Sequence, residues 1–290
     1  MRTPKEHVLF DMLKQLEKYC IAESVDIPQW VTYDGSYLGQ GKYEFDENNA
    51  QLITLGDHWN ARYDCARIFK AQVTLPESFK GKKIYLKLDF GGEIIVRIDG
   101  RIANSVSSRE KEGWVGRDTV NITPDFLKFG EAMNIELEAS VDSAGFCNAA
   151  MAGQKECEYT LKFAQFCVVD EICEKFYLNY VTAWEALNFI NDEFTRESVY
   201  KVLDDSIHLV DFDFDEEDTR KSIAIACEHF DNELSKIPYT AQSHVIFDGH
   251  SHIDVAWLWR HSVAYSGTLE GLYKTEQDLY EEMIEDTDDW

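Results

Sequence analysis

Several features that would point to common protein classes are missing from this sequence of 290 residues. The first residues carry Lys5, Glu6 and Asp11 where a secretory signal needs an unbroken apolar core, and no later stretch is apolar over the length of a bilayer. The seven cysteines form no Cys-x-x-Cys pair, which indicates neither a disulfide framework nor a zinc knuckle. No glycine-rich loop suited to a phosphate is present. These absences predict a soluble cytoplasmic protein with reduced thiols.

Basic residues are scarce. The 28 Lys and Arg are outnumbered by 54 Asp and Glu, and the formal net charge is −26. This charge would repel nucleic acids and anionic membranes, so neither is expected as a partner, and it favours a neutral substrate. The hydrophobic fraction of 44% is sufficient for sizeable cores, and the length suggests about two domains.

The first region, residues 1–28, is predicted to be an amino-terminal helix. Leu9, Met12, Leu16 and Tyr19 recur at helical spacing above a polar face, and Pro28 ends the region. We expect this helix to pack against the segment that follows it.

The second region, residues 29–170, has the two-residue period of β-strands. Phe69 to Leu75, Ile84 to Phe90 and Ile94 to Ile98 alternate apolar and polar side chains, and Asp99-Gly100 is typical of a hairpin turn. Further strands are expected at Ile135 to Val141 and at Tyr159 to Val169. Short alternating strands between turns predict an antiparallel β-sandwich. Its tryptophans are interpreted as core residues rather than as a sugar site: Trp30, Trp59 and Trp114.

The third region, residues 171–240, is predicted to be a small helical subdomain. Three apolar stripes mark its helices: Phe176, Tyr180, Trp184, Leu187, Ile190 and Phe194; then Val199, Val202 and Leu203; then Ile223, Cys227, Phe230, Leu234 and Ile237. The acidic run from Asp211 to Asp218 is expected to stabilise the start of the third helix through the helix dipole. A calcium site is the less favoured alternative, because the run lacks the glycine and terminal glutamate of a calcium loop.

The fourth region, residues 241–290, contains the most distinctive motif. The apolar run Val245 to Phe247 predicts a buried strand, and Gly249 permits a tight exit from it. His252 and Asp254 follow, and side chains two residues apart in extended backbone project to one face, where they can bind one metal ion. Imidazole and carboxylate together suit zinc. The spacing alone also fits an ordinary His-Asp hydrogen bond.

The residues around His252 and Asp254 support the metal hypothesis. His250 is a candidate for a supporting hydrogen bond, and Trp257 and Trp259 offer flat aromatic faces. Such faces beside a metal suit a polyhydroxylated substrate such as a sugar.

The eleven residues Gly249-His-Ser-His-Ile-Asp-Val-Ala-Trp-Leu-Trp259 resemble the opening of the catalytic domain of α-mannosidases of glycoside hydrolase family 38. The segment Phe79 to Gly100 resembles the jelly-roll-like domain that precedes that catalytic domain. The resemblance implies that His252 and Asp254 are two of four zinc ligands and that Trp257 lines the mannose pocket. It also implies a retaining reaction whose Asp nucleophile lies far downstream of the motif.

The resemblance stops soon after the motif, because 31 residues follow Trp259 and show no further family pattern. A retaining glycosidase needs two carboxyl groups at the scissile bond, and a zinc site needs at least three protein ligands. We therefore expect an amino-terminal portion of such an enzyme, inactive alone and truncated just inside the catalytic domain.

The expected fold class is multidomain α+β: a jelly-roll-like antiparallel β-sandwich, a small helical subdomain and the first strand of an α/β catalytic domain. The expected function is zinc-dependent, retaining hydrolysis of terminal α-linked mannose, with a mannose-containing oligosaccharide as partner. The alternative is a non-catalytic carbohydrate-binding or assembly module. The sequence leaves the oligomeric state open, a homo-oligomer of the full-length enzyme included.

Overall fold

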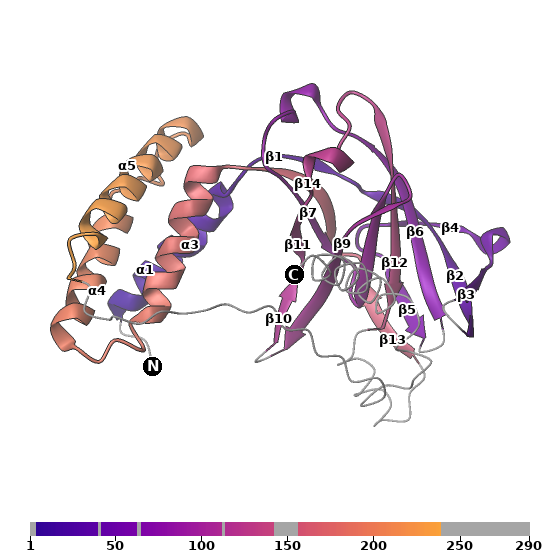
Figure 1. The fold of residues 1–290 in the computed structure, drawn as a ribbon, viewed down its shortest axis with the longest axis horizontal. Helices are drawn as coiled ribbons and strands as arrows, with labels where there is room; N and C mark the ends of the chain where they lie inside the picture. Colours follow the sequence, from indigo (N-terminus) through magenta and orange to yellow (C-terminus); the bar gives the residue numbers. More distant parts are fainter. Residues whose placement is uncertain (1–3, 40–41, 63–64, 112–113, 142–155, 239–290) are drawn as a thin grey trace, which may run out of the picture. The chain divides into compact units, whose positions relative to one another are not determined.

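The structure, a computed structural model, describes residues 4–39, 42–62, 65–111, 114–141 and 156–238. These residues form mostly antiparallel β-sheets together with a few helices, consistent with the predicted β-sandwich (Figure 1). The described chain divides into two compact units. One contains residues 24–167, and the other contains the residues before 24 and after 167.

Two larger sheets make up most of the sandwich unit. The smaller has four strands in the order β1 (Ile21–Asp26), β14 (Phe163–Val169), β7 (Ile84–Asp89) and β11 (Thr119–Asn121). The larger has eight strands in the order β10 (Trp114–Arg117), β9 (Arg101–Lys111), β8 (Glu93–Ile98), β12 (Ala132–Ser140), β6 (Cys65–Thr74), β2 (Gln29–Gly39) and β3 (Lys42–Phe45), with β4 (Gln51–Thr54) also paired to β2. A separate pair joins β5 (His58–Arg62) to β13 (Glu156–Thr160).

The alternation of apolar residues fixes which face of each central strand is buried. Leu137 of β12 lies opposite Phe69 of β6 and Val96 of β8, and none of the three is exposed. The predicted hairpin is confirmed, because β8 and β9 pair from Ile98 and Arg101 across Asp99-Gly100. Asp99 and Gly100 have φ angles of 47° and 80°, as a type I′ turn requires at both central positions.

Large aromatic residues fill the centre of the sandwich. Trp30 and Phe69 each meet Phe90 edge-to-face, and Trp59 meets Phe69 in the same way. The two buried indole N–H groups donate to backbone carbonyls, from Trp30 to Ile27 at 2.9 Å and from Trp59 to Phe90 at 2.7 Å. The assignment of Trp30 and Trp59 to the core is therefore confirmed. The assignment of Trp114 stays a prediction.

The predicted single strand from Tyr159 to Val169 is two strands. β13 ends at Thr160, β14 begins at Phe163, and Leu161 between them exchanges backbone hydrogen bonds with the turn at Gly56 and Asp57. The segment thus leaves β5 and joins the four-stranded sheet. Its apolar pattern is continuous because Leu161 is itself fully buried.

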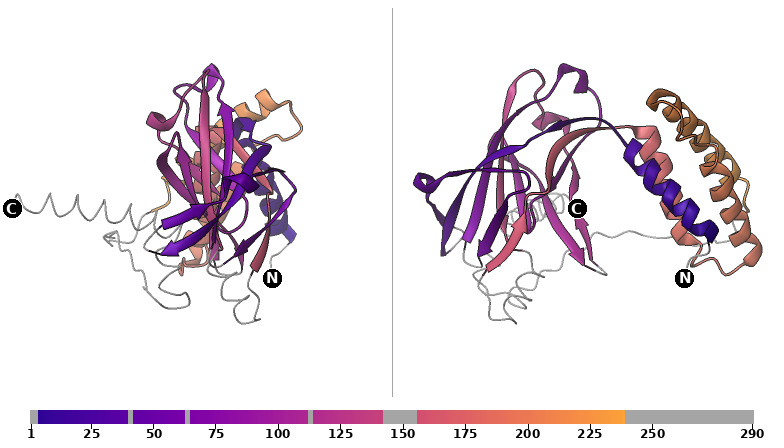
Figure 2. Two further views of the ribbon diagram at one scale, coloured as in Figure 1. Left: turned by 90° about the vertical axis from the view of Figure 1, so that its right-hand side faces the viewer. Right: turned by 180° about the vertical axis from the view of Figure 1, so that it is seen from behind.

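The helical unit contains α1 (Pro4–Tyr19), α3 (Glu171–Ala186), α4 (Glu193–Ile207) and α5 (Glu216–Leu234) (Figures 1 and 2). Leu9, Leu13 and Leu16 of α1 belong to the same apolar core as residues of the three later helices: Phe176, Tyr180, Leu203, Ile223 and Phe230. The first helix therefore packs against helices that follow it far along the chain. None of the described helices is long and apolar enough to cross a bilayer.

The amino-terminal helix is shorter than the predicted region 1–28. It ends at Tyr19, and Ile21 to Asp26 form strand β1 beside β14. Local periodicity could not show this, because the strand that pairs with β1 lies far along the chain.

The predicted stripe from Phe176 to Phe194 also ends early. Phe176 and Tyr180 are fully buried, and Trp184, Leu187 and Ile190 are partly buried against the core. Phe194 instead lies in the first turn of α4 and is 76% exposed. α3 ends at Ala186, so Phe176, Tyr180 and Trp184 are on a different helix from Phe194.

An aspartate caps the start of each of α3, α4 and α5. Asp170 accepts hydrogen bonds from the first turn of α3, Asp192 from that of α4, and Asp215 from the backbone N–H of Asp218 in α5. Capping by Asp215 and the acidic first turn of α5 agree with the role expected for residues 211–218.

Arg220 of α5 joins three segments of the helical unit. Its guanidinium donates to Oδ2 of Asp170 at 2.7 Å and to Oε1 of Glu216 at 2.8 Å. It also donates to the backbone carbonyls of Tyr19 at 2.8 Å and Ile21 at 3.0 Å. These carbonyls lie where the chain leaves α1, and Asp170 precedes α3. The single side chain therefore fixes both segments to α5.

We predict that Arg220→Met lowers the free energy of unfolding of the helical unit by about 2–3 kcal/mol, because the charge-assisted bonds are lost while the apolar stem is kept. Urea denaturation followed by far-ultraviolet circular dichroism measures this. Lys221→Met is the matched control, since Lys221 is 61% exposed and its ion pairs with Glu217 and Asp218 face solvent. Equal urea midpoints for the two variants would contradict the stabilising role assigned to Arg220.

Candidate functional site

The residues predicted to form the metal and sugar site lie outside the described part of the chain. His252, Asp254 and Trp257 belong to residues 239–290, as do His250 and the predicted strand Val245 to Phe247. The first strand of the α/β catalytic domain and the zinc site therefore stay predictions. Among the residues that the structure describes, no group of three or more His, Cys, Asp or Glu side chains is arranged to hold a metal ion.

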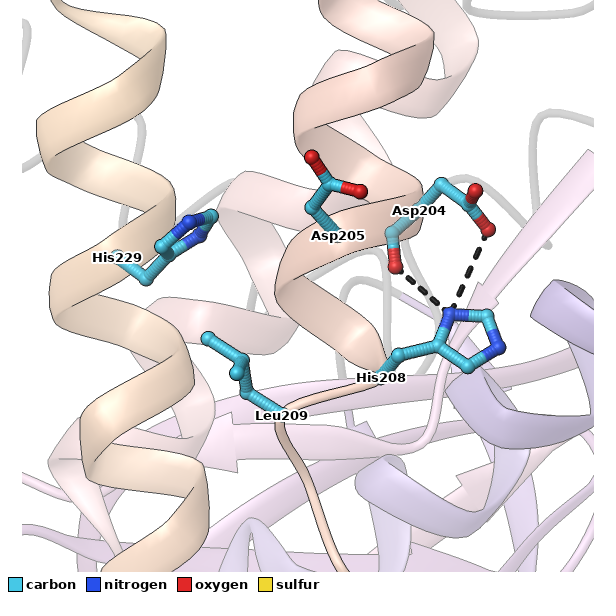
Figure 3. A pocket seen from close by; sticks show the side chains of 5 residues that line it. All are labelled: Asp204, Asp205, His208, Leu209 and His229. Carbon is cyan, nitrogen blue, oxygen red and sulfur yellow. Dashed lines mark hydrogen bonds and ion pairs between the residues drawn. The ribbon is translucent and has the colours of Figure 1, made fainter.

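A pocket of about 480 Å³ lies between α4 and α5 (Figure 3). It is open to solvent and is lined by Asp204, Asp205, His208, Leu209 and His229. Figure 3 shows His229 on α5 across from the residues at the end of α4.

The two histidines of this pocket belong to separate hydrogen-bonding pairs. Nδ1 of His208 lies 2.7 Å from the backbone oxygen of Asp204 and 3.4 Å from its carboxylate Oδ1 (Figure 3). Nδ1 of His229 instead lies 3.0 Å from the hydroxyl of Ser206, which is fully buried. One ring thus caps the last turn of α4, and the other ties α5 to α4.

These contacts give the pocket a structural role in helix packing. Burial raises the pKa of the Tyr180 hydroxyl, and the negative charge of the nearby Asp204 carboxylate raises it further. No motif in the sequence points to His208 or His229. No spacing pattern could have found them together, because they come from different helices.

Buried and partly buried cysteines form the other group of potentially reactive side chains. Burial, with neighbouring carboxylates adding to it, raises the pKa of Cys20 to about 12 and that of Cys173 to about 12. Burial raises the pKa of Cys167 to about 11. Cys20, Cys167, Cys173 and Cys227 form no disulfide, as expected from the cysteine spacing. A neutral thiol is a weak nucleophile, so these three residues have structural roles.

We predict that Cys20 and Cys173 resist alkylation by iodoacetamide at pH 8 in the folded protein. A pKa of about 12 leaves on the order of one thiolate in ten thousand molecules at that pH. Peptide mass spectrometry measures the labelled fraction, and the urea-unfolded protein, in which both thiols should react, is the control. Labelling of either residue at the same rate in both states would refute the prediction.

Comparison with known proteins gives a limited result. No protein-family model matches the chain, and no curated protein matches it. Solved structures that match include the β-glucuronidase of Faecalibacterium prausnitzii, at 15% identity and a TM-score of 0.35, over 51% of this chain and 32% of that one. The β-glucuronidase of Ruminococcus gnavus without ligand matches at 11% identity and a TM-score of 0.34, over 51% and 29%.

The chain therefore spans about a third of the length of these solved proteins. Similarity at this TM-score assigns neither a fold nor an activity to it.

Proposed function

We propose that the chain is part of a zinc-dependent, retaining α-mannosidase that hydrolyses terminal α-linked mannose. The observation that carries the proposal is the motif from Gly249 to Trp259, in which the residues resembling two zinc ligands and a sugar-pocket tryptophan occur at the spacing of the family 38 enzymes. The antiparallel sandwich before it is compatible with the jelly-roll-like domain implied by the resemblance of residues 79–100.

The donor atoms of the motif fit zinc. An imidazole nitrogen from His252 and a carboxylate oxygen from Asp254 are ligands that zinc accepts, and their separation by one residue lets both reach one ion from an extended segment. Bound zinc would act as a Lewis acid that holds neighbouring sugar hydroxyls. His252 and Asp254 would position the ion, and Trp257 would stack against the apolar face of the mannose ring.

The chemistry of the reaction requires more than the motif. Retaining hydrolysis uses a nucleophilic carboxylate and a second carboxyl group as acid and base, about 5–5.5 Å apart. The resemblance leaves no catalytic residue in this sequence, since the nucleophile is expected downstream of it. The partner is a mannose-containing oligosaccharide, a neutral ligand that a chain of net charge −26 does not repel.

A carbohydrate-binding module without catalysis is the second candidate function. The observation that favours it is a group of exposed apolar residues on β2, β3 and β4, Val31, Phe45 and Leu52, which lie near paired charges. Both functions share a sugar as ligand, and they differ in whether the chain takes part in bond cleavage.

We predict that the 290-residue chain releases no nitrophenol from nitrophenyl α-mannoside, with or without added zinc. The motif supplies two of the three or more ligands that zinc needs and no pair of catalytic carboxyl groups. Absorbance of released nitrophenolate is the measurement, and His252→Ala is the control. Turnover by the unaltered chain above that of His252→Ala would overturn the prediction that the chain is inactive alone.

We predict that, in a longer protein that contains this chain and the remaining zinc ligands, His252→Ala and Asp254→Ala each lower the zinc content and abolish mannosidase activity. Each change removes one ligand of the ion. Zinc is measured by atomic emission on dialysed protein, and Ser251→Ala, next to the ligands, is the matched control. Unchanged zinc in either ligand variant would refute the metal site, and full zinc without mannosidase activity in the unaltered protein would refute the proposed reaction.

A further inference from the structure

The eight-stranded sheet has a second face, on which Ile68 and Ile95 are buried and charged side chains lie around them. Residues directly opposite each other in antiparallel strands point to the same side of the sheet. Leu137, Phe69 and Val96 lie opposite one another and point into the core. Their neighbours Glu136, Lys70 and Arg97 are likewise opposite one another and must point to the other side.

This second face carries a row of paired charges. Lys70 Nζ lies 3.5 Å from Glu136 and 3.8 Å from Glu47, and Arg97 lies 3.6 Å from Glu136 and 2.7 Å from Glu138. Two positively charged side chains thus form ion pairs with three carboxylates. In a chain with a net charge of −26, this row is close to electrically balanced. It offers hydrogen-bond donors and acceptors without a strong field of either sign.

An apolar surface adjoins the charged row on β2, β3 and β4. Val31 lies opposite both Lys70 and Leu52, so the three side chains share the same face. Phe45 lies opposite Gly35 on that face as well. We call the following residues the aromatic patch: Val31, Tyr33, Tyr43, Phe45 and Leu52. Leu52 is 65% exposed, Val31 43% and Phe45 39%, whereas Tyr33 is buried.

The local sequence holds the Phe45 ring in place. A Cβ atom at Gly35 would collide with Cδ1 and Cε1 of Phe45, so the ring lies directly over the glycine backbone. Tyr43 stacks beside Phe45 with centroids 5.7 Å apart and an interplanar angle of 22°, and Tyr33 meets Phe45 edge-to-face at 6.0 Å. The ring is therefore pre-positioned, which lowers the entropy cost of binding a ligand to it.

The aromatic patch and the charged row are close enough to contact one small ligand. Lys70 Nζ lies 5.2 Å from the centre of the Tyr33 ring, and the Tyr33 hydroxyl donates to Oε1 of Glu47 at 3.3 Å. Tyr33 thus adjoins Phe45 on one side and Lys70 and Glu47 on the other. An apolar stacking surface and exposed polar groups are separated by a single aromatic side chain.

We propose that the aromatic patch, with Lys70 and Glu47, is a binding site for a neutral carbohydrate. A pyranose has an apolar face, which suits the ring of Phe45, and a rim of hydroxyls, which can both donate to Glu47 and accept from Lys70. A ligand with a net charge would gain little from a balanced row of charges, and an anion would be repelled by the chain as a whole. The proposal takes its ligand class from the proposed function. It does not depend on zinc or on His252 and Asp254.

The test is affinity electrophoresis of the full chain in native gels that contain α-mannan or, separately, dextran. We expect α-mannan to retard the protein and Phe45→Ala to weaken that binding about tenfold, as the loss of one stacking contact implies. Leu52→Asp, at an exposed position where the change leaves the core intact, should weaken binding by a similar factor. Retardation by dextran as well would support a site for neutral carbohydrates in general.

Matched controls lie in the helical unit. Phe189→Ala and Leu178→Asp change residues that are 82% and 53% exposed, and they should bind as the unaltered chain does. The site is overturned if neither gel retards the chain, if both patch variants bind normally, or if the control variants lose binding equally.

The double variant His252→Ala, Asp254→Ala separates this site from the proposed metal site. Normal retardation of that variant supports the sandwich site, and lost retardation overturns it in favour of the motif. The zinc content of the longer protein tests the metal site independently of either result.

Discussion

The register of β12 between β6 and β8 is the constraint on which both faces of the large sheet depend. Leu137 must lie between Phe69 and Val96 for the core to close, and this places Glu136 between Lys70 and Arg97. A shift of one residue would move the carboxylates into the core and expose the leucine. Burial of a carboxylate without a partner costs more free energy than the hydrogen bonds of the shifted strand could provide. The apolar core thus determines the charged row on the other face.

Much of the sandwich could be predicted from sequence because its signals are local. Ile84, Leu86 and Leu88 alternate within one strand, and Asp99-Gly100 specifies a turn through two residues that tolerate positive φ. Contacts between distant segments carry no such signal. The separation of β13 from β14, the pairing of β1 with β14 and the packing of α1 on α3 each depend on a partner that is remote in sequence.

The two proposed sites differ in the same way: one is visible in the local sequence, and the other depends on contacts between distant segments. His252 and Asp254 could be proposed because a metal site needs particular donor atoms at short spacing, and those are visible in sequence. The aromatic patch could not, because Gly35, Phe45 and Leu52 come together only through the pairing of β2 with β3 and β4. Arg220 was missed for the same reason. Its partners at Tyr19, Ile21 and Asp170 lie 50 or more residues away.

Stacking and metal binding would recognise different parts of a sugar, which is why the two proposed sites are compatible within one protein. A zinc ion holds neighbouring hydroxyls and must be dehydrated in a defined coordination geometry, so it discriminates between sugars that differ at one carbon. An aromatic ring contacts the apolar face common to many pyranoses and discriminates weakly. The net charge of −26 acts on both sites alike. Over distances up to the screening length, it repels anionic ligands and has no effect on neutral ones. A surface that binds many neutral glycans weakly would raise their local concentration for a site that selects mannose.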